Sequence, residues 1–329
     1  MPKPSRTLGT GLILMTVAAL SGCTAADPPL PVTFTQQEWI SPVGGQGVEL
    51  TTEHFVLRVT TPDTALREVL PEFMETAYAE YAALMPPAQN VGERLTVYLF
   101  GRRDEWALFT RGFAPSLADT YLHIHAGGYT DYASATAVTF DIRRDKTLSL
   151  LAHEGYHQYV AKYFPRPVIP WLNEGMATQF EAFELQGGRP TFTPLRNHLR
   201  RNDLRAALAV EAVETKPGES RRGLIPLRQL LSTDAGEVIR QTGHPVRTYY
   251  AQVWLLILML RSPEYRGGFE MLLADAGTER IEVAIRGQRV ATPDGETISD
   301  GEMIFRHYIT EDIDGFEEEF RAFARYLLF

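Results

Sequence analysis

The stretch 148–177 reads LSLLAHEGYHQYVAKYFPRPVIPWLNEGMA, and its pattern predicts two helices in succession. Apolar residues at helical spacing predict the first helix over Thr147–Phe164, and Pro165 stops it. The second helix is predicted from Pro170 to about Leu185. The proline-rich turn between them would let the second helix pack back on the first.

The first helix carries His153-Glu154-Gly155-Tyr156-His157, an HExxH motif. Residues four apart lie on one helix face, so both imidazoles can reach a single metal ion, with Glu154 beside the water that the ion holds. A catalytic zinc site usually takes three protein ligands and leaves the fourth position for water. The motif therefore predicts a zinc site that still needs one ligand.

Glu174 is the predicted third ligand. It lies 17 residues after His157, within the segment WLNEGMA at 171–177. Packing of the second helix on the first would bring its carboxylate to the two histidines, and Zn²⁺ is the expected cofactor.

These features resemble the gluzincin metallopeptidases, in which HExxH is followed by a glutamate on the next helix, often within WLNEG or WLxEGxA. The likeness extends to the peptidase-MA-like bacterial proteins of largely unassigned substrate, which share an early HF strand (His54, Phe55) and a later Tyr-Ala-Gln helix. It covers most of the chain after residue 50 and is specific between Leu148 and Glu181. It implies a zincin-like fold and zinc-dependent cleavage of peptide bonds. No GAMEN-like segment precedes the motif, so the exopeptidase activity of the large aminopeptidases is not implied.

The resemblance also suggests partners for the ligands. A ligand histidine normally gives its second N–H to an acceptor that fixes its orientation. Glu181, seven residues beyond Glu174 and so on the same face of the predicted helix, is the candidate acceptor, and Asn173 is placed with it as a second predicted partner. A solvated surface position is the alternative for Glu181, and Glu184 is a competing candidate.

The predicted mechanism gives Glu154 the proton transfers, first from the attacking water and then to the leaving amine. The developing oxyanion needs a further donor, which gluzincins often take from a later helix. Tyr250 is favoured for this role over its neighbour Tyr249, although both could be packing residues.

Other histidines and arginines carry weaker signals. His123 and His125 alternate as on one face of a strand, but a structural or cleft-lining role is preferred to a metal pair. Four arginines near one predicted helix could bind a substrate carboxylate, although a solvated helix face is the preferred explanation; they are Arg196, Arg200, Arg201 and Arg205. No usable pattern surrounds His198, His244 or His307.

The N-terminal segment has the features of an export signal. Lys3 and Arg6 precede an apolar run over Leu12–Leu20 that is too short to span a bilayer. The sequence LSGC at 20–23 resembles a bacterial lipobox, and Cys23 is the only cysteine. Lipidation of Cys23 is therefore expected, with a plain secretory signal as the alternative.

Removal of residues 1–22 would leave 30 Lys and Arg against 41 Asp and Glu, a net charge of −11. Such an acidic chain is unsuited to neutralising phosphates, so nucleic acid is not an expected partner. Residues 23–32 are polar and proline-rich, which suits an extended tether between a membrane and the domain. The expected location is the bacterial cell envelope, with the lipid holding the chain to a membrane.

The predicted fold class is α+β, with two subdomains. Residues 33–145 mix strands and a helix, and residues 146–329 hold the HExxH helix and a mainly helical remainder. The expected strands are Glu53–Val59, Leu95–Phe100 and Ala135–Ile142. The further expected helices are Thr64–Leu84, Leu195–Val213, Tyr249–Leu260 and Gly315–Leu328.

The function that these expectations describe is a zinc-dependent peptidase acting on peptides or proteins in the cell envelope. The main alternative is a catalytically silent lipoprotein that uses a zincin fold as a binding or assembly module. A related zinc hydrolase, such as an amidase on cell-wall peptides, would share the same ligands. The presence of Glu154 favours activity, because this residue serves proton transfer and does not hold the ion.

The lipid anchor can be tested directly. Replacing Cys23→Ser removes the only thiol that can be acylated, so the protein should be released from the membrane or remain unprocessed. Fractionation and intact-mass measurement check this. A variant with unchanged membrane attachment and unchanged mass would rule the anchor out.

Overall fold

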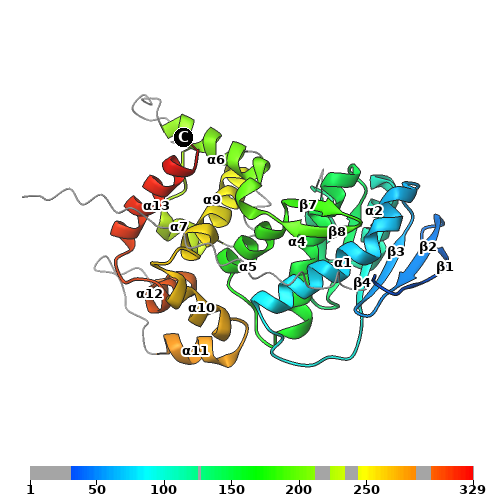
Figure 1. Cartoon of the computed structure of the whole chain (residues 1–329), viewed down its shortest axis with the longest axis horizontal. Helices are drawn as coiled ribbons and strands as arrows, with labels where there is room; N and C mark the ends of the chain where they lie inside the picture. Colours follow the sequence, from blue (N-terminus) through cyan, green and yellow to red (C-terminus); the bar gives the residue numbers. More distant parts are fainter. Residues whose placement is uncertain (1–30, 125–126, 212–222, 234–243, 287–297, 329) are drawn as a thin grey trace, which may run out of the picture. The chain divides into compact units, whose positions relative to one another are not determined.

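The computed structural model describes residues 31–124, 127–211, 223–233, 244–286 and 298–328, and Val32–Phe329 forms one compact unit (Figure 1). Cys23 and the export segment lie outside the described residues. The unit spans the residues assigned to both predicted subdomains. Its α+β class with a small mixed sheet is as predicted. Within the described part of the chain, no helix is both long enough and apolar enough to cross a membrane.

The main sheet has six strands in the order β1-β2-β3-β4-β6-β5. Strands β3, β4 and β6 run parallel to one another, whereas β1, β2 and β5 are antiparallel to their neighbours. The strands are β1 (Thr35–Ile40), β2 (Gln46–Thr51), β3 (Phe55–Val59), β4 (Leu95–Phe100), β5 (Gly128–Asp131) and β6 (Thr136–Phe140), with β7 (Phe183–Gln186) and β8 (Arg189–Phe192) forming a separate hairpin.

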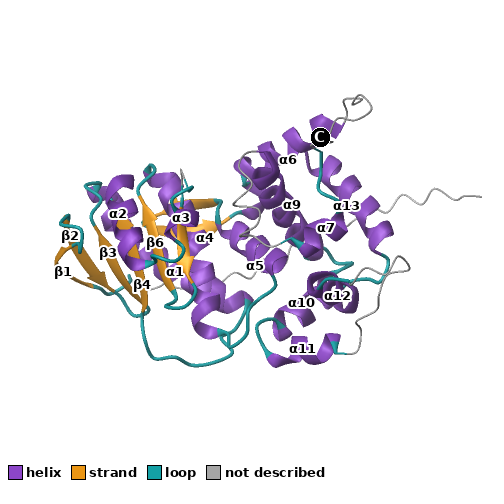
Figure 2. Cartoon of the chain, turned by 180° about the vertical axis from the view of Figure 1, so that it is seen from behind, coloured by secondary structure: helices purple, strands orange, loops and turns teal. Residues whose placement is uncertain are grey.

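Helices cover both faces of the sheet and make up most of the later chain (Figure 2). The described helices are α1 (Thr64–Leu84), α2 (Arg103–Phe113), α3 (Ala118–Tyr121), α4 (Arg144–Tyr163), α5 (Pro170–Ala177), α6 (His198–Glu211), α7 (Leu227–Ser232), α9 (His244–Leu260), α10 (Arg266–Asp275), α11 (Glu279–Ile285), α12 (Asp300–Tyr308) and α13 (Ile313–Leu328), with short 3-10 turns η1 (Thr178–Phe180) and η2 (Pro194–Arg196).

Strand β4 shows how the sheet separates two cores. Because successive side chains of a strand point to opposite faces, Leu95, Val97 and Leu99 join the large core with α1 and α4. Phe100 belongs to a second cluster on the other face, with Trp106 of α2. The continuous apolar sequence of this strand is therefore explained by burial on both faces.

Helix α4 is fixed on one side by α1 and on the other by the sheet. The hydroxyl of Tyr81 in α1 donates to the carbonyl of Ala152 at 2.6 Å. On the sheet side, the amide nitrogen of Gln158 donates to the carbonyls of Thr96 at 2.6 Å and Ala135 at 2.8 Å. These bonds set the height and rotation of the helix that carries the HExxH residues.

Helix α5 packs against α4 on one side and α9 on the other. Gly175 permits the second contact, because a Cβ at this position would lie 2.7 Å from Cγ1 of Ile257 and 2.9 Å from the backbone oxygen of Val253. The close approach of these two helices places α9 beside the residues of α4.

The predicted second helix is wrong beyond Ala177. The helix ends there, a 3-10 turn follows, and Phe183–Gln186 is a strand paired with Arg189–Phe192. Gly187 and Gly188 form the two-residue turn with φ of 58° and 86°, which is the geometry that a tight hairpin requires. The Gly-Gly pair was thus a local signal for a hairpin that the helical reading overlooked.

The predicted strand over Ala135–Ile142 and the helix over Thr147–Phe164 are present with shifted ends, as β6 and α4. Thr64–Leu84 and Leu95–Phe100 agree residue for residue with α1 and β4. The expected helix over Leu195–Val213 begins later, at His198, and its last two residues lie outside the described residues.

The close contact at Gly175 leads to a stability prediction. Gly175→Ala should lower the free energy of unfolding by about 1–3 kcal/mol, because the added methyl group forces α5 and α9 apart. Denaturant unfolding with a chelator present would measure this without a contribution from metal binding.

Gly112→Ala is the matched control, since Gly112 lies in α2 with nothing within 4 Å of its added Cβ. It should be neutral or stabilising by about 0.5–1 kcal/mol, because alanine loses less entropy in a helix. Equal effects of the two substitutions would contradict the proposed close packing.

Candidate metal centre

The two histidines of the motif lie one turn apart on α4 and face each other. Their Nε2 atoms are 3.1 Å apart, and their rings meet edge to face with centroids 4.8 Å apart. Both side chains are buried. The helix thus brings together two ring nitrogens at a single point, as the i, i+4 spacing predicts.

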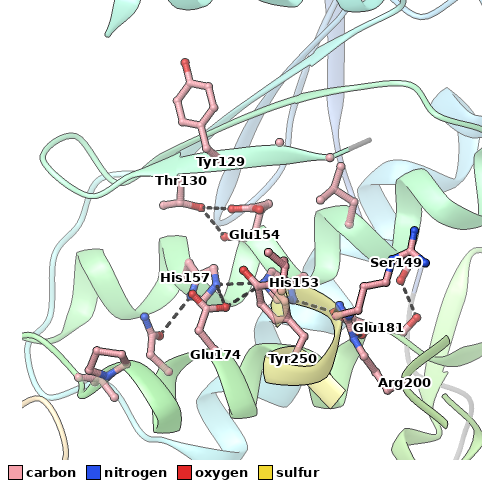
Figure 3. A pocket seen from close by; sticks show the side chains of 18 of the residues that line it. Tyr129, Thr130, Ser149, His153, Glu154, His157, Glu174, Glu181, Arg200 and Tyr250 are labelled. Atoms are coloured by element: carbon pink, nitrogen blue, oxygen red, sulfur yellow. Dashed lines mark hydrogen bonds and ion pairs between the residues drawn. The ribbon is translucent and has the colours of Figure 1, made fainter. Parts of the chain in front are cut away.

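Glu174 reaches the same point from α5. Its Oε2 lies 3.4 Å from Nε2 of His153 and 3.3 Å from Nε2 of His157, and the carboxylate is buried (Figure 3). Glu184, the competing candidate, is exposed and pairs with Arg196, so it is not part of this group. Among the described residues, His153, His157 and Glu174 form the one group of three that could hold a metal ion.

The hydrogen bonds of the two Nδ1 atoms show which histidine nitrogens are left to bind an ion. Nδ1 of His153 lies 3.0 Å from a carboxylate oxygen of Glu181, and Nδ1 of His157 lies 3.2 Å from the amide oxygen of Asn173. Both oxygens are acceptors, so each Nδ1 carries a proton, and Nε2 is the nitrogen whose lone pair each ring can give to an ion. Oε2 of Glu174 is buried without a hydrogen bond. Three lone-pair donors therefore converge on one point, where they could hold a metal ion.

The spacing of the three donor atoms fits a metal ion. Bonds of 2.0–2.1 Å in a tetrahedral arrangement place neighbouring ligand atoms about 3.3–3.4 Å apart. The separations here are 3.1, 3.3 and 3.4 Å. The ligand triangle is therefore of the right size without rearrangement of the side chains.

The electrostatics also favour a positive charge at this point. Burial lowers the pKa of His153, but the carboxylates of Glu174 and Glu181 outweigh burial and raise it to about 10. Burial raises the pKa of Glu174, but the imidazoles of His157 and His153 outweigh it and lower that pKa below its ordinary value. Glu174 thus keeps its negative charge in the buried site.

Glu154 lies beside the triad of His153, His157 and Glu174, and its carboxylate is held by strand β5. The hydroxyl of Thr130 donates to its Oε2 at 2.9 Å and lies 3.0 Å from its backbone oxygen (Figure 3). Both residues are buried. Thr130 is 24 residues from its partner, and nothing in the local sequence indicated this contact.

The two candidate tyrosines of α9 have different surroundings. Tyr249 is fully buried among core residues. Tyr250 instead lines an open cavity that also contains the two histidines, and its ring centroid lies 6.1 Å from that of His153. Burial raises the pKa of Tyr250 well above its ordinary value, and the charge of Glu174 adds to this. Tyr250 therefore keeps its hydroxyl proton at neutral pH and is the one of the pair that can donate into the site.

Glu181 contacts His153, as expected, but from a position that the sequence did not predict. It follows the 3-10 turn η1, so it does not share a helix face with Glu174. Its carboxylate also accepts hydrogen bonds from Asn197 at 2.8 Å and from Arg200 at 2.5 and 2.8 Å. The side chain of Arg200 is only 13% exposed and is paired with Glu181, so the preferred interpretation of it as a solvated residue is wrong.

Among the described residues, the other histidines and arginines considered from the sequence form no hydrogen bond or ion pair with His153, His157, Glu174 or Glu181. His123 lies in a turn after α3, not on a strand, and its Nδ1 is 2.6 Å from the backbone oxygen of Asp119. His125 lies outside the described residues. The other arginines have partners elsewhere: Arg196 pairs with Glu184, Arg201 donates to the backbone oxygen of Leu327, and Arg205 donates to Asn202.

A large open cavity of about 2060 Å³ contains the triad. Tyr132, Ile169 and Ile281 line it along with Glu154 and Tyr250. Small-molecule pockets usually measure about 300–1,000 Å³, so this cavity is large enough for a segment of a polymer.

No known protein-family model matches the chain, and comparison with curated proteins gives no match.

The ligand geometry leads to a prediction about metal binding. His153→Ala, His157→Ala and Glu174→Ala should each weaken zinc binding by more than the roughly 10–100-fold that is usual for loss of a ligand's hydrogen-bond partner, because each removes a direct donor. Competition with a chromophoric chelator would measure the affinity, and the intact protein should hold one ion per chain.

The matched controls are His123→Ala and Glu184→Ala, which change the same residue types elsewhere on the cavity lining. Both should bind zinc as the unaltered protein does. Full zinc affinity in any of the three ligand variants would place the ion elsewhere.

Proposed function

We propose that this protein is a zinc-dependent peptidase of the gluzincin type. The observation that carries the proposal is the buried convergence of His153, His157 and Glu174, with the carboxylate of Glu154 next to them and free of the ligand group. This combination separates residues that hold an ion from one that can transfer protons. The zincin-like fold belongs to the same proposal and is supported by an HExxH helix that packs on a mixed sheet.

The donor set favours zinc among the common metals. Two imidazoles and one carboxylate are a usual ligand set of catalytic zinc sites, which keep a fourth position for water. Calcium and magnesium prefer oxygen ligands, and a site with two ring nitrogens suits them poorly. When bound, zinc would supply Lewis-acid activation of a water molecule and of the scissile carbonyl.

The chain's own residues would then handle the protons. Glu154 accepts a proton from the attacking water and passes it to the leaving amine nitrogen. The hydroxyl of Thr130 holds Oε2 of Glu154, which leaves Oε1 as the oxygen that exchanges protons. Buried donors and acceptors with fixed partners need little rearrangement during the reaction.

Tyr250 is the proposed donor to the oxyanion that develops on the scissile carbonyl. It lines the cavity on the side of His153 and keeps its proton, as described above. A preformed donor of this kind is worth about 10²–10³ in kcat in other acyl-transfer enzymes. Tyr249, which points into the core, is not proposed to take part.

The substrate class is proposed from the size of the cavity. About 2060 Å³ of open space around the triad suits an extended peptide or a loop of a protein. Peptides of the cell wall belong to the same substrate class. The N-terminal lipobox-like segment supports action in the cell envelope, on the outer side of a bacterial membrane.

The proposal predicts that binding of zinc and turnover can be separated. Glu154→Gln should bind zinc normally but lose hydrolysis of peptides, because the amide cannot accept the proton of the attacking water. Incubation of the zinc-loaded domain with a diverse peptide library, followed by mass spectrometry, would reveal the products.

Glu184→Gln is the matched control, since it makes the same change on an exposed carboxylate of the same cavity. It should cleave as the unaltered protein does. Identical products from Glu154→Gln and the unaltered protein would remove the peptidase proposal, and zinc binding without any cleavage by either would favour a silent binding module.

A further inference from the structure

Arg200 is a largely buried cation that contacts residues around His153, His157 and Glu174. Its side chain lies on α6 with 13% of its surface exposed. Its Nε donates to Oε2 of Glu181 and its Nη2 donates to Oε1, at 2.8 and 2.5 Å. This is the two-pronged pairing of a guanidinium with a carboxylate, which fixes the plane of the carboxylate as well as its position.

The carboxylate that Arg200 holds is the one that orients a ligand. Oε1 of Glu181 receives both the Nη2 proton of Arg200 and the Nδ1 proton of His153. The backbone oxygen of Glu181 also accepts a bond from Ser149 at 2.7 Å. Rotation of this carboxylate would therefore turn the ring of His153 and move its Nε2 lone pair.

The same guanidinium lies over Tyr250. Its central carbon is 4.9 Å from the centroid of the tyrosine ring, which is within the range of a cation–π contact. Figure 3 shows Arg200 and Glu181 on one side of His153 and Tyr250 directly beside it. One side chain thus contacts both the acceptor of a ligand histidine and the candidate oxyanion donor.

We propose that Arg200 is a positioning residue that holds Glu181 and Tyr250 together, and so couples the orientation of the ligand His153 to that of the oxyanion donor. Arginine is suited to this task because its planar guanidinium can pair with a carboxylate through two N–H groups and stack on a ring at the same time. Lysine offers a point charge and can do one of these at a time.

The test compares Arg200→Lys with Arg205→Lys on the same helix. Arg205 is exposed and bonds to Asn202, away from the site, so it is the matched control. Arg200→Lys should weaken zinc binding by about 10-fold, at the lower end of the effects usual for such partners, since a cation still faces Glu181. The absorption bands of the cobalt-substituted protein should shift, because they report the ligand geometry. Arg205→Lys should change neither property.

Two double-variant cycles assign the effect to its routes. If Arg200 acts on the metal through Glu181, Arg200→Lys should cause little further loss of zinc affinity in a Glu181→Gln protein. If it acts on catalysis through Tyr250, it should lower kcat at saturating zinc with KM nearly unchanged, and should add little to the effect of Tyr250→Phe. The kinetic cycle rests on the proposed peptidase function, whereas the zinc and cobalt measurements do not.

A residue that merely supports the fold would give another pattern. In that case Arg200→Lys would lower the melting temperature but leave zinc affinity, the cobalt spectrum and kcat unchanged in the folded protein, and this result would overturn the proposal. If Arg200→Lys does not fold, Arg200→Met combined with Glu181→Gln removes both buried charges together and avoids leaving one of them unpaired. If Arg200 acts through Glu181, this double variant should have the zinc affinity of Glu181→Gln alone, a loss of about 10–100-fold. Zinc affinity equal to that of the unaltered protein, or a loss well beyond that of Glu181→Gln, would overturn the proposal.

Discussion

The burial of helix α4 on nearly all sides is the constraint on which the rest of the structure depends. Buried polar groups are costly unless they are bonded, and this helix carries His153, Glu154, His157 and Gln158 within a single buried turn and a half. Each of them needs a partner from another part of the chain. The surrounding segments provide these hydrogen-bond partners, and their packing on α4 follows from this requirement.

The partners come from several elements that are far apart in the sequence. Strand β5 brings Thr130 to Glu154, and strand β4 accepts a hydrogen bond from the amide of Gln158. The middle of α5 brings Asn173 and Glu174 to the two histidines. Helix α6 adds Arg200 behind Glu181. The approach of α9 to α5, which the lack of a side chain at Gly175 permits, then brings Tyr250 to the same place. The site therefore forms only when the sheet and the later helices have both packed on α4.

How much the sequence could predict depends on how local each signal is. His153 and His157 are set by helix periodicity, and Glu174 by a short turn between two helices, so their convergence follows from local pattern. Glu181 was chosen by extending the second helix past its real end, and the 3-10 turn and hairpin that replace it still deliver the carboxylate to His153. Thr130 and Arg200 reach the site through tertiary packing, and no local sequence pattern predicts such contacts.

The charges around the triad give a further reason why the network has this composition. Glu154, Glu174 and Glu181 have buried carboxylates, and among the described residues the largely buried Arg200 is the one guanidinium that pairs with them. Once both histidines are neutral, as ligands of an ion must be, this leaves two negative charges in a poorly solvated region, which a divalent cation would balance. A second arginine beside these carboxylates would compete with the ion for their negative charge. Without any arginine, the unpaired carboxylate of Glu181 would draw the Nδ1 proton of His153 toward itself. One guanidinium, placed behind Glu181 and not beside Glu174, offsets the charge of the carboxylate that orients the ligand and leaves that of the ligand itself for the metal.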